Sequence, residues 1–433
     1  MNRTTQQGTP TWFTTALAWL TPRRLRVQAV LLALCMWGFC AVDFATPGLF
    51  DRAGNIKFQD FLPFYVSARL ISQQRAGKLY DQQIVANEIG AIIHDSSGRE
   101  PTHVRLTNLY GPQVGFLFVP LAQLPFPTAG WIWVALSIVA YFGCVYLLWK
   151  CCAGLRSCAR TAAISAIAFP PLFHFFLRGQ ISVLALACFT AAFLALRADR
   201  GLLAGIALGF LVFKPPFLIA IPSVLLLAMA WKVLAGVVAS ASAQLAFSWV
   251  YFGSDVMRSY FDTLWHVSRW IGTAELPLAP VQMHSLRSFW TLLVPWREAA
   301  FVLYILSSLA AIAVAAAIWK STSPPVLRFS ALTLAAVLVN PHLFVYDLLV
   351  LAPVLLLLVD WTLANSHNQH SAALQLLSYL AFILPLFGPL SFWTHLQLSV
   401  PVFAALLWIL GQVSASTSRR TGSPLASHET RDV

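Results

Sequence analysis

One aspartate in the sequence has neighbours that suggest chemistry. Asp60 lies in "NIKFQDFLPFYVSARL", residues 55–70, among aromatic side chains, and this stretch follows a wholly apolar segment. A carboxylate in such a place can act as a general base on a hydroxyl group. Aspartate is also a favoured helix N-cap, so Asp60 could begin the helix that is expected from Phe61, with Pro63 in its first turn. The two roles are compatible.

Basic and imidazole side chains lie beside apolar segments elsewhere in the chain. Such groups are costly at membrane depth and by default mark a functional cavity. Several of them together can hold a phosphate and stabilise it as a leaving group. Prolines at 215, 216 and 341 break the adjoining helices and free backbone N–H groups that favour anions. The predicted phosphate-binding residues are Arg178, Lys214, His284, Arg287 and His342.

Structural interpretations of these residues also stay open. Arg178 and Lys214 could be charges that extend to the membrane surface, although they lie on the side of the chain that is poor in basic residues. His342 could be an ordinary loop histidine. Asp347 lies a turn into an apolar segment, where it could pair with a cation for structural reasons alone.

The composition indicates a membrane protein. The 433 residues are 58% hydrophobic and only 10% charged, with a mean hydropathy of +0.72, whereas soluble domains have about 25% charged residues. Apolar runs of this length cannot all be buried in one water-soluble core. Backbone groups in lipid must be satisfied within each helix, so we expect an all-α polytopic membrane protein.

Twelve apolar segments have about the length needed to span a bilayer. They lie at 27–46, 128–149, 161–177, 180–197, 201–214, 216–231, 233–252, 299–319, 326–340, 343–360, 372–388 and 392–412. Two further apolar pieces, 113–126 and 285–295, are short and bounded by proline. They are typical of re-entrant or interfacial segments that line a cavity.

The basic residues predict the orientation. The net charge is +12, and most Lys and Arg fall in the two tails and in the short loops of one side, which is then cytoplasmic. We expect a cytoplasmic N-terminal segment (1–26), a transmembrane catalytic domain (27–412) and a disordered cytoplasmic tail (413–433). The long segments 47–127 and 253–298, and with them Asp60 and the cations, would then be extracytoplasmic. Nucleotide sugars are scarce there, so any donor would be lipid-linked or exported.

Seven short motifs follow one another between about residues 58 and 360. They are "QDFLPFYVSARL", "KLYD", "YGPQVGFLFVPLAQLP", "RGQISVLALA", "GIALGFLVFKPPF", "HSLRSF" and "NPHLFVYDLLVLAPVL". With these motifs in this order, the chain resembles glycosyltransferase family 87. This family is a branch of the GT-C superfamily of polytopic enzymes that use polyprenyl-phosphate sugars. Two motifs depart from the family pattern: "YGPQ" replaces Tyr-x-Pro-Pro, and "NPHLFVYD" differs from the His-rich version of the mannoside-building members.

The resemblance implies a GT-C fold with a catalytic Asp in the first outer loop, where Asp60 stands. It also implies an undecaprenyl- or decaprenyl-phosphate donor, most often of mannose, and a lipid- or glycan-linked acceptor. The place of action would be the bacterial inner membrane, with the active site facing the periplasm. The outer loops contain no DxD-type pair, so neither a metal nor another cofactor is expected.

The expected reaction is an inverting displacement in which Asp60 takes the proton from an acceptor hydroxyl. Residues expected to bind the sugar or the acceptor are Tyr65, Tyr110, Gln180, Asn340 and Tyr346. The segment 253–283, with Trp265, His266 and Trp270, would either cover the site or form an amphipathic surface helix.

Two other classes of protein remain open from the sequence. A multi-pass transporter or lipid flippase would explain the twelve spans equally well, but it predicts internal repeats with matched broken helices, and none is evident. A surface-glycan polymerase or ligase would more naturally carry its largest outer loop late in the chain, whereas here the largest loop comes first.

Overall fold

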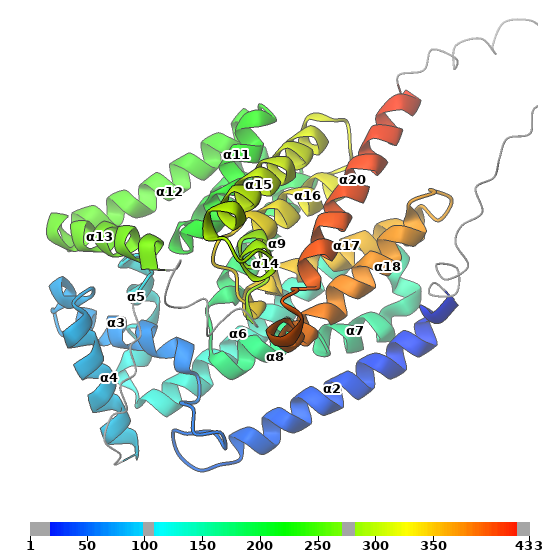
Figure 1. The fold of residues 1–433 in the computed structure, drawn as a ribbon. Coiled ribbons are helices and arrows are strands. Elements are labelled where there is room, and N and C mark those ends of the chain that lie inside the picture. Colours follow the sequence, from blue (N-terminus) through cyan, green and yellow to red (C-terminus); the bar gives the residue numbers. More distant parts are fainter. Residues whose placement is uncertain (1–17, 98–107, 271–281, 422–433) are drawn as a thin grey trace, which may run out of the picture.

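The computed structural model describes residues 18–97, 108–270 and 282–421. In these ranges the chain is a bundle of helices, and its β-structure consists of two isolated β-bridges. The predicted all-helical class is therefore confirmed for the described residues. In Figure 1 the long helices run roughly side by side, with the described start of the chain and the end of the last helix on the right.

Eight helical stretches of the described chain are long and apolar enough to cross a membrane. Two of them are composite: α7 (Ala159–Ile167) and α8 (Pro170–Arg178) form one, and α18 (Ser371–Ile383) and α19 (Ser391–Thr394) form another. A third, Val345–Ala364, begins as a 3-10 helix and continues as α17 (Leu351–Ala364). The other five are α2 (Pro22–Phe44), α6 (Phe126–Trp149), α12 (Trp231–Phe252), α15 (Arg297–Lys320) and the first part of α20 (Ser399–Thr421).

Four shorter apolar helices account for the remaining predicted segments. They are α9 (Ser182–Arg197), Gly201–Phe213 with α10 (Gly201–Gly209), Pro215–Leu227 with α11 (Ala220–Leu227), and α16 (Pro325–Val339). All twelve predicted segments thus coincide with apolar helices, while the number that cross a membrane stays a prediction. The last helix ends at Thr421, so it continues past Gln412, where the tail was expected to begin.

Three interruptions of the bundle helices are the features that position the site. Gly179 ends α8 with a φ of 67°. Lys214, with φ −129° and ψ 73°, separates the 3-10 turn Phe210–Phe213 from the 3-10 turn Pro215–Leu218, which begins with two prolines. Asn340 ends α16, and Pro341 follows it. Proline lacks the N–H that would continue a helix, and glycine accepts the left-handed backbone that terminates one. The sequence therefore forces each break locally.

Shorter helices cover the end of the bundle at which these breaks lie. The first long segment folds into α3 (Leu62–Ser72), α4 (Gln82–Ser97) and α5 (Gln113–Phe118), at the left of Figure 1. The second contains α13 (Ser254–Trp270) and α14 (Leu286–Leu293). Tyr260 of α13 lies 5.7 Å from Tyr80, ring centroid to ring centroid, so the two segments are in contact. The predicted short pieces 113–126 and 285–295 contain α5 and α14.

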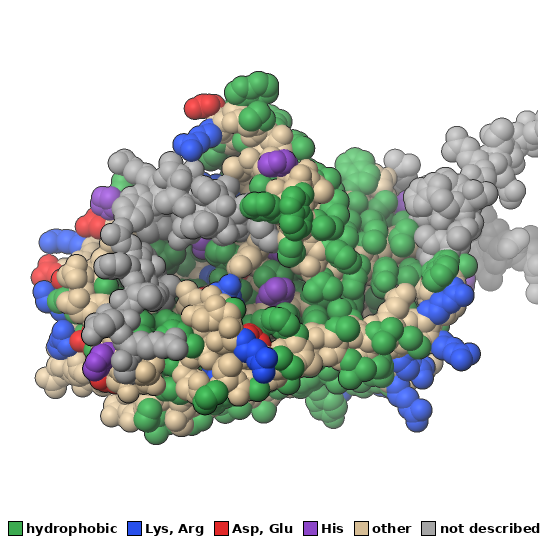
Figure 2. Space-filling view, turned by 60° about the horizontal axis from the view of Figure 1, so that its bottom comes forward, with side chains coloured by type: hydrophobic (Ala, Val, Ile, Leu, Met, Phe, Trp, Pro, Cys, Tyr) green, Lys and Arg blue, Asp and Glu red, His purple; other side chains and the backbone are tan. Residues whose placement is uncertain are grey.

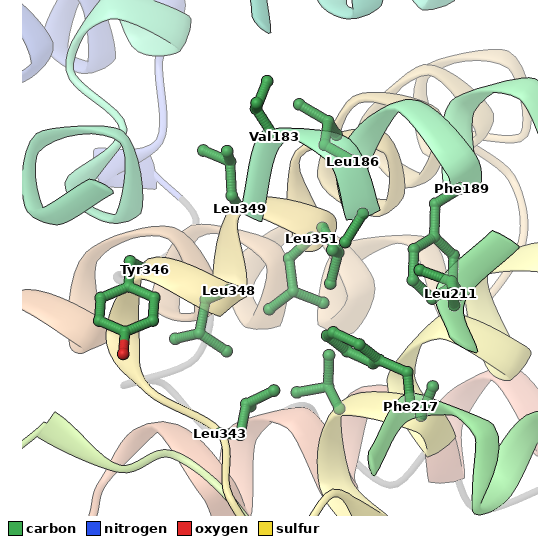
Figure 3. Close-up of a cluster of buried hydrophobic side chains, with 14 of the residues drawn as sticks. Val183, Leu186, Phe189, Leu211, Phe217, Leu343, Tyr346, Leu348, Leu349 and Leu351 are labelled. Carbon is green, nitrogen blue, oxygen red and sulfur yellow. The ribbon is translucent and has the colours of Figure 1, made fainter. Parts of the chain in front are cut away.

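The core and the surface of the molecule fit a lipid environment. Figure 3 shows buried side chains from α9, the Lys214 break and the start of α17 packed into one apolar cluster, with Tyr346 at its margin. Figure 2 shows a broad hydrophobic surface over the middle of the molecule and charged side chains gathered mostly at its left and right ends. An apolar band between polar ends is the surface that a bilayer requires.

Candidate active site

The loop that carries Asp60 is held by an aromatic anchor. Phe58 precedes a short 3-10 helix, Gln59–Phe61, and has a left-handed φ of 58°. Its side chain is buried between Phe44 and Trp131, whose ring centroids lie 5.3 Å and 5.0 Å away. The backbone N–H of Phe61 donates to the carbonyl oxygen of Phe58 at 2.8 Å. Asp60 therefore projects, half-buried, from a fixed turn.

Gly179 brings a second turn against this loop. A Cβ at Gly179 would lie 2.9 Å from the Cβ of Phe58, which is closer than side chains approach, so only glycine fits. The Nε1–H of Trp133 donates to the carbonyl oxygen of Gly179 at 3.0 Å. The turn from α8 to α9, with Arg178 and Gln180, therefore rests directly on the segment that holds Asp60.

Hydrogen bonds connect the two turns. The amide Nε2 of Gln180 donates to Oδ2 of Asp60 at 3.4 Å. The Oε1 of Gln180 accepts from the backbone N–H of Ile181 at 2.9 Å and from the hydroxyl of Tyr110 at 3.4 Å. Arg178 donates from Nη1 to Oε1 of Gln59 at 3.5 Å. Asp60, Arg178, Gln180 and Tyr110 are thus brought together, as predicted.

The surroundings of Asp60 suit a group that takes up a proton. Burial raises the pKa of its carboxyl above the ordinary value. The charges of Arg178 and Lys214 and hydrogen bonds from Gln180 and Tyr346 oppose this rise without cancelling it. A carboxylate with a raised pKa is a stronger base than one in water.

A buried ionic network lies next to Asp60. Nζ of Lys214 forms a salt bridge with Oδ1 of Asp347, and both side chains are almost fully buried. The hydroxyl of Ser182 donates to the same oxygen at 2.5 Å. Oδ2 of Asp347 accepts from the backbone N–H of Phe344 at 3.3 Å. This network joins α9, the Lys214 break and the start of α17, and it confirms the expected pairing of Asp347 with a cation.

Tyr346 links the ionic network to Asp60. Its ring centroid lies 5.6 Å from Nζ of Lys214, and its side chain is one of the groups that limit the rise in the pKa of the Asp60 carboxyl. Tyr346 is only 6% exposed. In Figure 3 Tyr346 stands at the edge of the apolar cluster, beside Leu348. The predicted sugar- or acceptor-binding Tyr346 therefore does lie beside the predicted base.

His342, Asn340 and Arg287 form a second group near the network. The backbone N–H of His342 donates to Oδ1 of Asn340 at 2.9 Å. Nδ2 of Asn340 is buried and has no hydrogen-bond partner in the described part of the chain. Burial lowers the pKa of His342 to about 4, with opposing influence from Asp347 and further lowering by Lys214 and Arg287. His342 is therefore neutral near pH 7, and it shares the electrostatic surroundings of the network.

His284 lies deeper than expected for a phosphate ligand. It is 0% exposed, and its Nδ1 is 2.7 Å from the hydroxyl oxygen of Ser399 at the start of α20. Its backbone N–H donates to the carbonyl oxygen of Leu343 at 2.9 Å. Burial, with a contribution from His174, lowers the pKa of His284 to about 3. The side chain is thus a neutral imidazole and not the cation that the sequence suggested.

Tyr65 occupies a different place from the other predicted residues. Its hydroxyl donates to the carbonyl oxygen of Leu124 at 2.6 Å, and its ring lies against Phe126 with centroids 5.3 Å apart. These contacts fasten α3 to the beginning of α6 and the residues just before it.

The segment that was expected to cover the site forms α13 in its described part. Trp265 is 62% exposed, and Nδ1 of His266 is 2.7 Å from the carbonyl oxygen of Asp262 in the same helix. The side chain of Trp270 lies outside the described residues.

The sequence reasoning missed Ser182 and Gln59 as members of the site. Ser182 bonds to Asp347, and Gln59 accepts from Arg178. Gln59 is directly before Asp60, and Ser182 is two residues after Gln180, so both polar residues lie close to residues that were singled out. Polarity in a segment that is otherwise apolar was the available signal.

The comparisons with known proteins identify the family. Searches of the curated proteins and of solved structures found no match. The family model described as "Glycosyltransferase family 87" matches residues 108–346. This range contains Tyr110, Gln180, Lys214 and Tyr346. Asp60 lies before it, and Asp347 lies directly after it. Because the match spans more than half of the chain, the protein belongs to glycosyltransferase family 87 and is a glycosyltransferase.

Proposed function

We propose that this protein transfers a hexose, most often mannose in the family it resembles, from a polyprenyl-phosphate donor to a hydroxyl of a lipid- or glycan-linked acceptor. The transfer takes place on the extracytoplasmic face of the bacterial inner membrane. The observation that supports this most is the half-buried carboxylate of Asp60, bonded to Gln180 at 3.4 Å and next to Arg178, Lys214 and Tyr346. A base, cations and hydroxyl groups meet there at the end of an apolar bundle.

The proposed step is a single inverting displacement. The acceptor oxygen attacks C1 of the sugar and forms the new glycosidic bond, while its proton passes to a carboxylate oxygen of Asp60. The bond from C1 to the phosphate oxygen breaks, and polyprenyl phosphate leaves with the electron pair. Positioning of the two reactants and removal of the proton are the contributions that the protein makes. Gln180, Tyr110 and Tyr346 orient the base, the sugar or the acceptor.

The two cations of the site take different roles in this proposal. The charge of Lys214 is already offset by Asp347. Arg178 donates to the neutral Gln59 at 3.5 Å, and among the described residues it forms no ion pair. A guanidinium matches a phosphate in two-point geometry. Arg178 is therefore the main phosphate ligand, and Lys214 holds Tyr346 and Asp347 in place. Arg287 and the neutral His342 bind further phosphate oxygens by hydrogen bonds, whereas His284 is fully buried and contacts Ser399.

The family membership supports a glycosyltransferase over a transporter. A transporter or flippase would not break a glycosidic phosphate bond. A surface-glycan polymerase would use a diphosphate-linked oligosaccharide as the donor. Incubation of the purified protein with radiolabelled polyprenyl-phosphate mannose and a native lipid extract separates these activities, because only the proposed enzyme converts this donor into a labelled glycolipid.

Asp60→Asn tests the proposed base. We expect the transfer rate to fall by about 10²–10⁴-fold, the usual contribution of a general base, because an amide cannot accept the proton. The matched control is Asp81→Asn, the same change in the same outer segment. Asp81 caps α4 by accepting from the backbone N–H of Ile84 at 3.2 Å, and Asn caps equally well. Full turnover by the folded Asp60→Asn protein would exclude Asp60 as the base.

A further inference from the structure

An apolar cavity lies at the opposite end of the bundle from Asp60. It is a groove of about 320 Å³ between α2, α7 and α18, with α6 and α17 forming its floor. Ala29, Leu32, Ala162, Leu356 and Phe382 are among the apolar residues that line it, and none of the lining residues is charged. The volume falls within the usual range of ligand pockets, and the lining suits a hydrocarbon chain.

The groove lies where α2 and α18 are held apart. α2 packs along α7 and reaches the start of α8. Its connection to α18 is the hydrogen bond from the hydroxyl of Tyr379 to Oε1 of Gln28, at 3.0 Å. In Figure 1, α2 runs along the lower edge of the bundle, set apart from α18. Hydrocarbon that occupied this gap would cover apolar surface on both helices.

Three arginines lie beside residues that line the groove. Nε of Arg26 donates to Oγ1 of Thr161, which lines the groove, at 3.4 Å. Arg156 is exposed on the 3-10 turn before α7, and Arg160 is exposed in the first turn of α7. Within the described chain none of these three arginines forms an ion pair with a carboxylate. The mouth therefore combines a positive charge with an entry for an apolar chain.

A buried hydroxyl points to an occupant with polar atoms below its head group. Ser378 of α18 lines the groove and is 3% exposed. Its Oγ has no hydrogen-bond partner in the described residues. Buried polar groups are normally satisfied, so an ester or glycerol oxygen at this depth would complete the bonding of Ser378.

We propose that this groove binds an anionic phospholipid of the inner leaflet, with acyl chain in the groove and phosphate at Arg26 and Arg160. The donor of the proposed reaction is not the occupant, because its phosphate must reach Asp60 at the other end of the bundle. The lipid fills the gap and fixes α2, whose far end continues into the loop that carries Phe58 and Asp60. This inference concerns binding and stands apart from the proposed reaction.

Lipid retention by the purified protein tests the charge at the mouth. Native mass spectrometry in detergent would compare phosphatidylglycerol with phosphatidylcholine at equal concentration. We expect phosphatidylglycerol to bind more tightly and the Arg26→Gln/Arg160→Gln protein to bind it about 25-fold more weakly, roughly fivefold for each arginine. Arg200→Gln is the control, since Arg200 is exposed on another loop of the same predicted face. Equal binding of the two lipids would overturn the proposal.

A plug tests whether the groove is the place of binding. Ala162→Trp would fill the groove from α7, whereas Ala163→Trp adds the same ring at the next residue, which is exposed and lies outside the lining. We expect only Ala162→Trp to lose phosphatidylglycerol. Equal loss from both variants, competition by inorganic phosphate alone, or preferential binding of polyprenyl phosphate would each exclude the proposed occupant. Because the measurement is of binding, its outcome does not depend on whether Asp60 is catalytic.

Discussion

At the scale of single residues, the environment of Asp60 makes it a better base than an aspartate in water. Burial raises its pKa, and the amide of Gln180 donates to it at 3.4 Å and so limits the rise. A group with a raised pKa is ionised above that pKa and becomes protonated as the pH falls through it. Transfer should therefore be lost on the acid side at a pH above the ordinary pKa of aspartate.

Gln180→Leu should move this acid limb. Removal of the amide donor takes away a bond that favours the ionised form, so the pKa of Asp60 rises further. We expect the acid limb of kcat/KM against pH to shift to higher pH in this variant. Gln244→Leu is the control, because Gln244 bonds to the carbonyl oxygen of Gly209 at 3.3 Å and not to Asp60. An unmoved limb would mean that another group controls the pH dependence.

The pair Lys214 and Asp347 should be strongly coupled in stability. Both are almost fully buried, and removal of one partner leaves a buried charge without compensation, at a cost of about 3–5 kcal/mol. Lys214→Met should therefore destabilise the protein by about this amount, and Lys214→Met/Asp347→Asn by clearly less, in unfolding measurements in detergent.

An exposed pair provides the comparison for this cycle. Nζ of Lys78 lies 3.9 Å from Oδ2 of Asp81, and both side chains are well exposed. Lys78→Met should change the stability by only about 0–1 kcal/mol, since water screens such pairs. If the two single changes at Lys214 and Asp347 simply added up in the double variant, the proposed coupling would be absent.

At the scale of elements, the site is formed where helices are broken. The turns at Gly179, at Lys214 and at Asn340 lie at the same end of the bundle, against the loop that holds Asp60. Local sequence was sufficient to predict each break, because Pro and Gly act on their own backbone. It was not sufficient to predict which broken ends touch, because that depends on how α3, α9 and α17 pack.

Gly179→Ala should disturb the site through one of these turns. The left-handed φ of 67° costs a residue with a Cβ about 1–2 kcal/mol, and the new Cβ would meet Phe58 at 2.9 Å. We expect both lower stability and slower transfer, because Gln180 would move away from Asp60. Gly143→Ala is the control: a Cβ there meets nothing within 4 Å inside α6, so stability should stay the same or rise. Wild-type behaviour of Gly179→Ala would show that the turn has room to adjust.

At the scale of the whole molecule, the prediction to be tested is the orientation. Gln82 and Ala198 are exposed at opposite ends of the bundle, at the start of α4 and after α9. In a variant whose native cysteines have been replaced, Gln82→Cys should react with a membrane-impermeant maleimide in right-side-out vesicles. Ala198→Cys should react only after permeabilisation. The reverse pattern would place Asp60 on the cytoplasmic side and contradict the proposed use of an exported donor.

The sequence by itself determined the class of the protein and the helices, because hydropathy, proline, glycine and the distribution of Lys and Arg act over a few residues at a time. It also pointed to Asp60, Arg178, Gln180 and Tyr346 as members of one site. Only the tertiary structure decided the contacts among them. Gln180 meets Asp60 across 120 residues of sequence, and Lys214 meets Asp347 across 133. Such pairs form only when distant helices pack. The same packing places the hydroxyl of Tyr65 on the carbonyl oxygen of Leu124 and buries the neutral His284 beside Ser399.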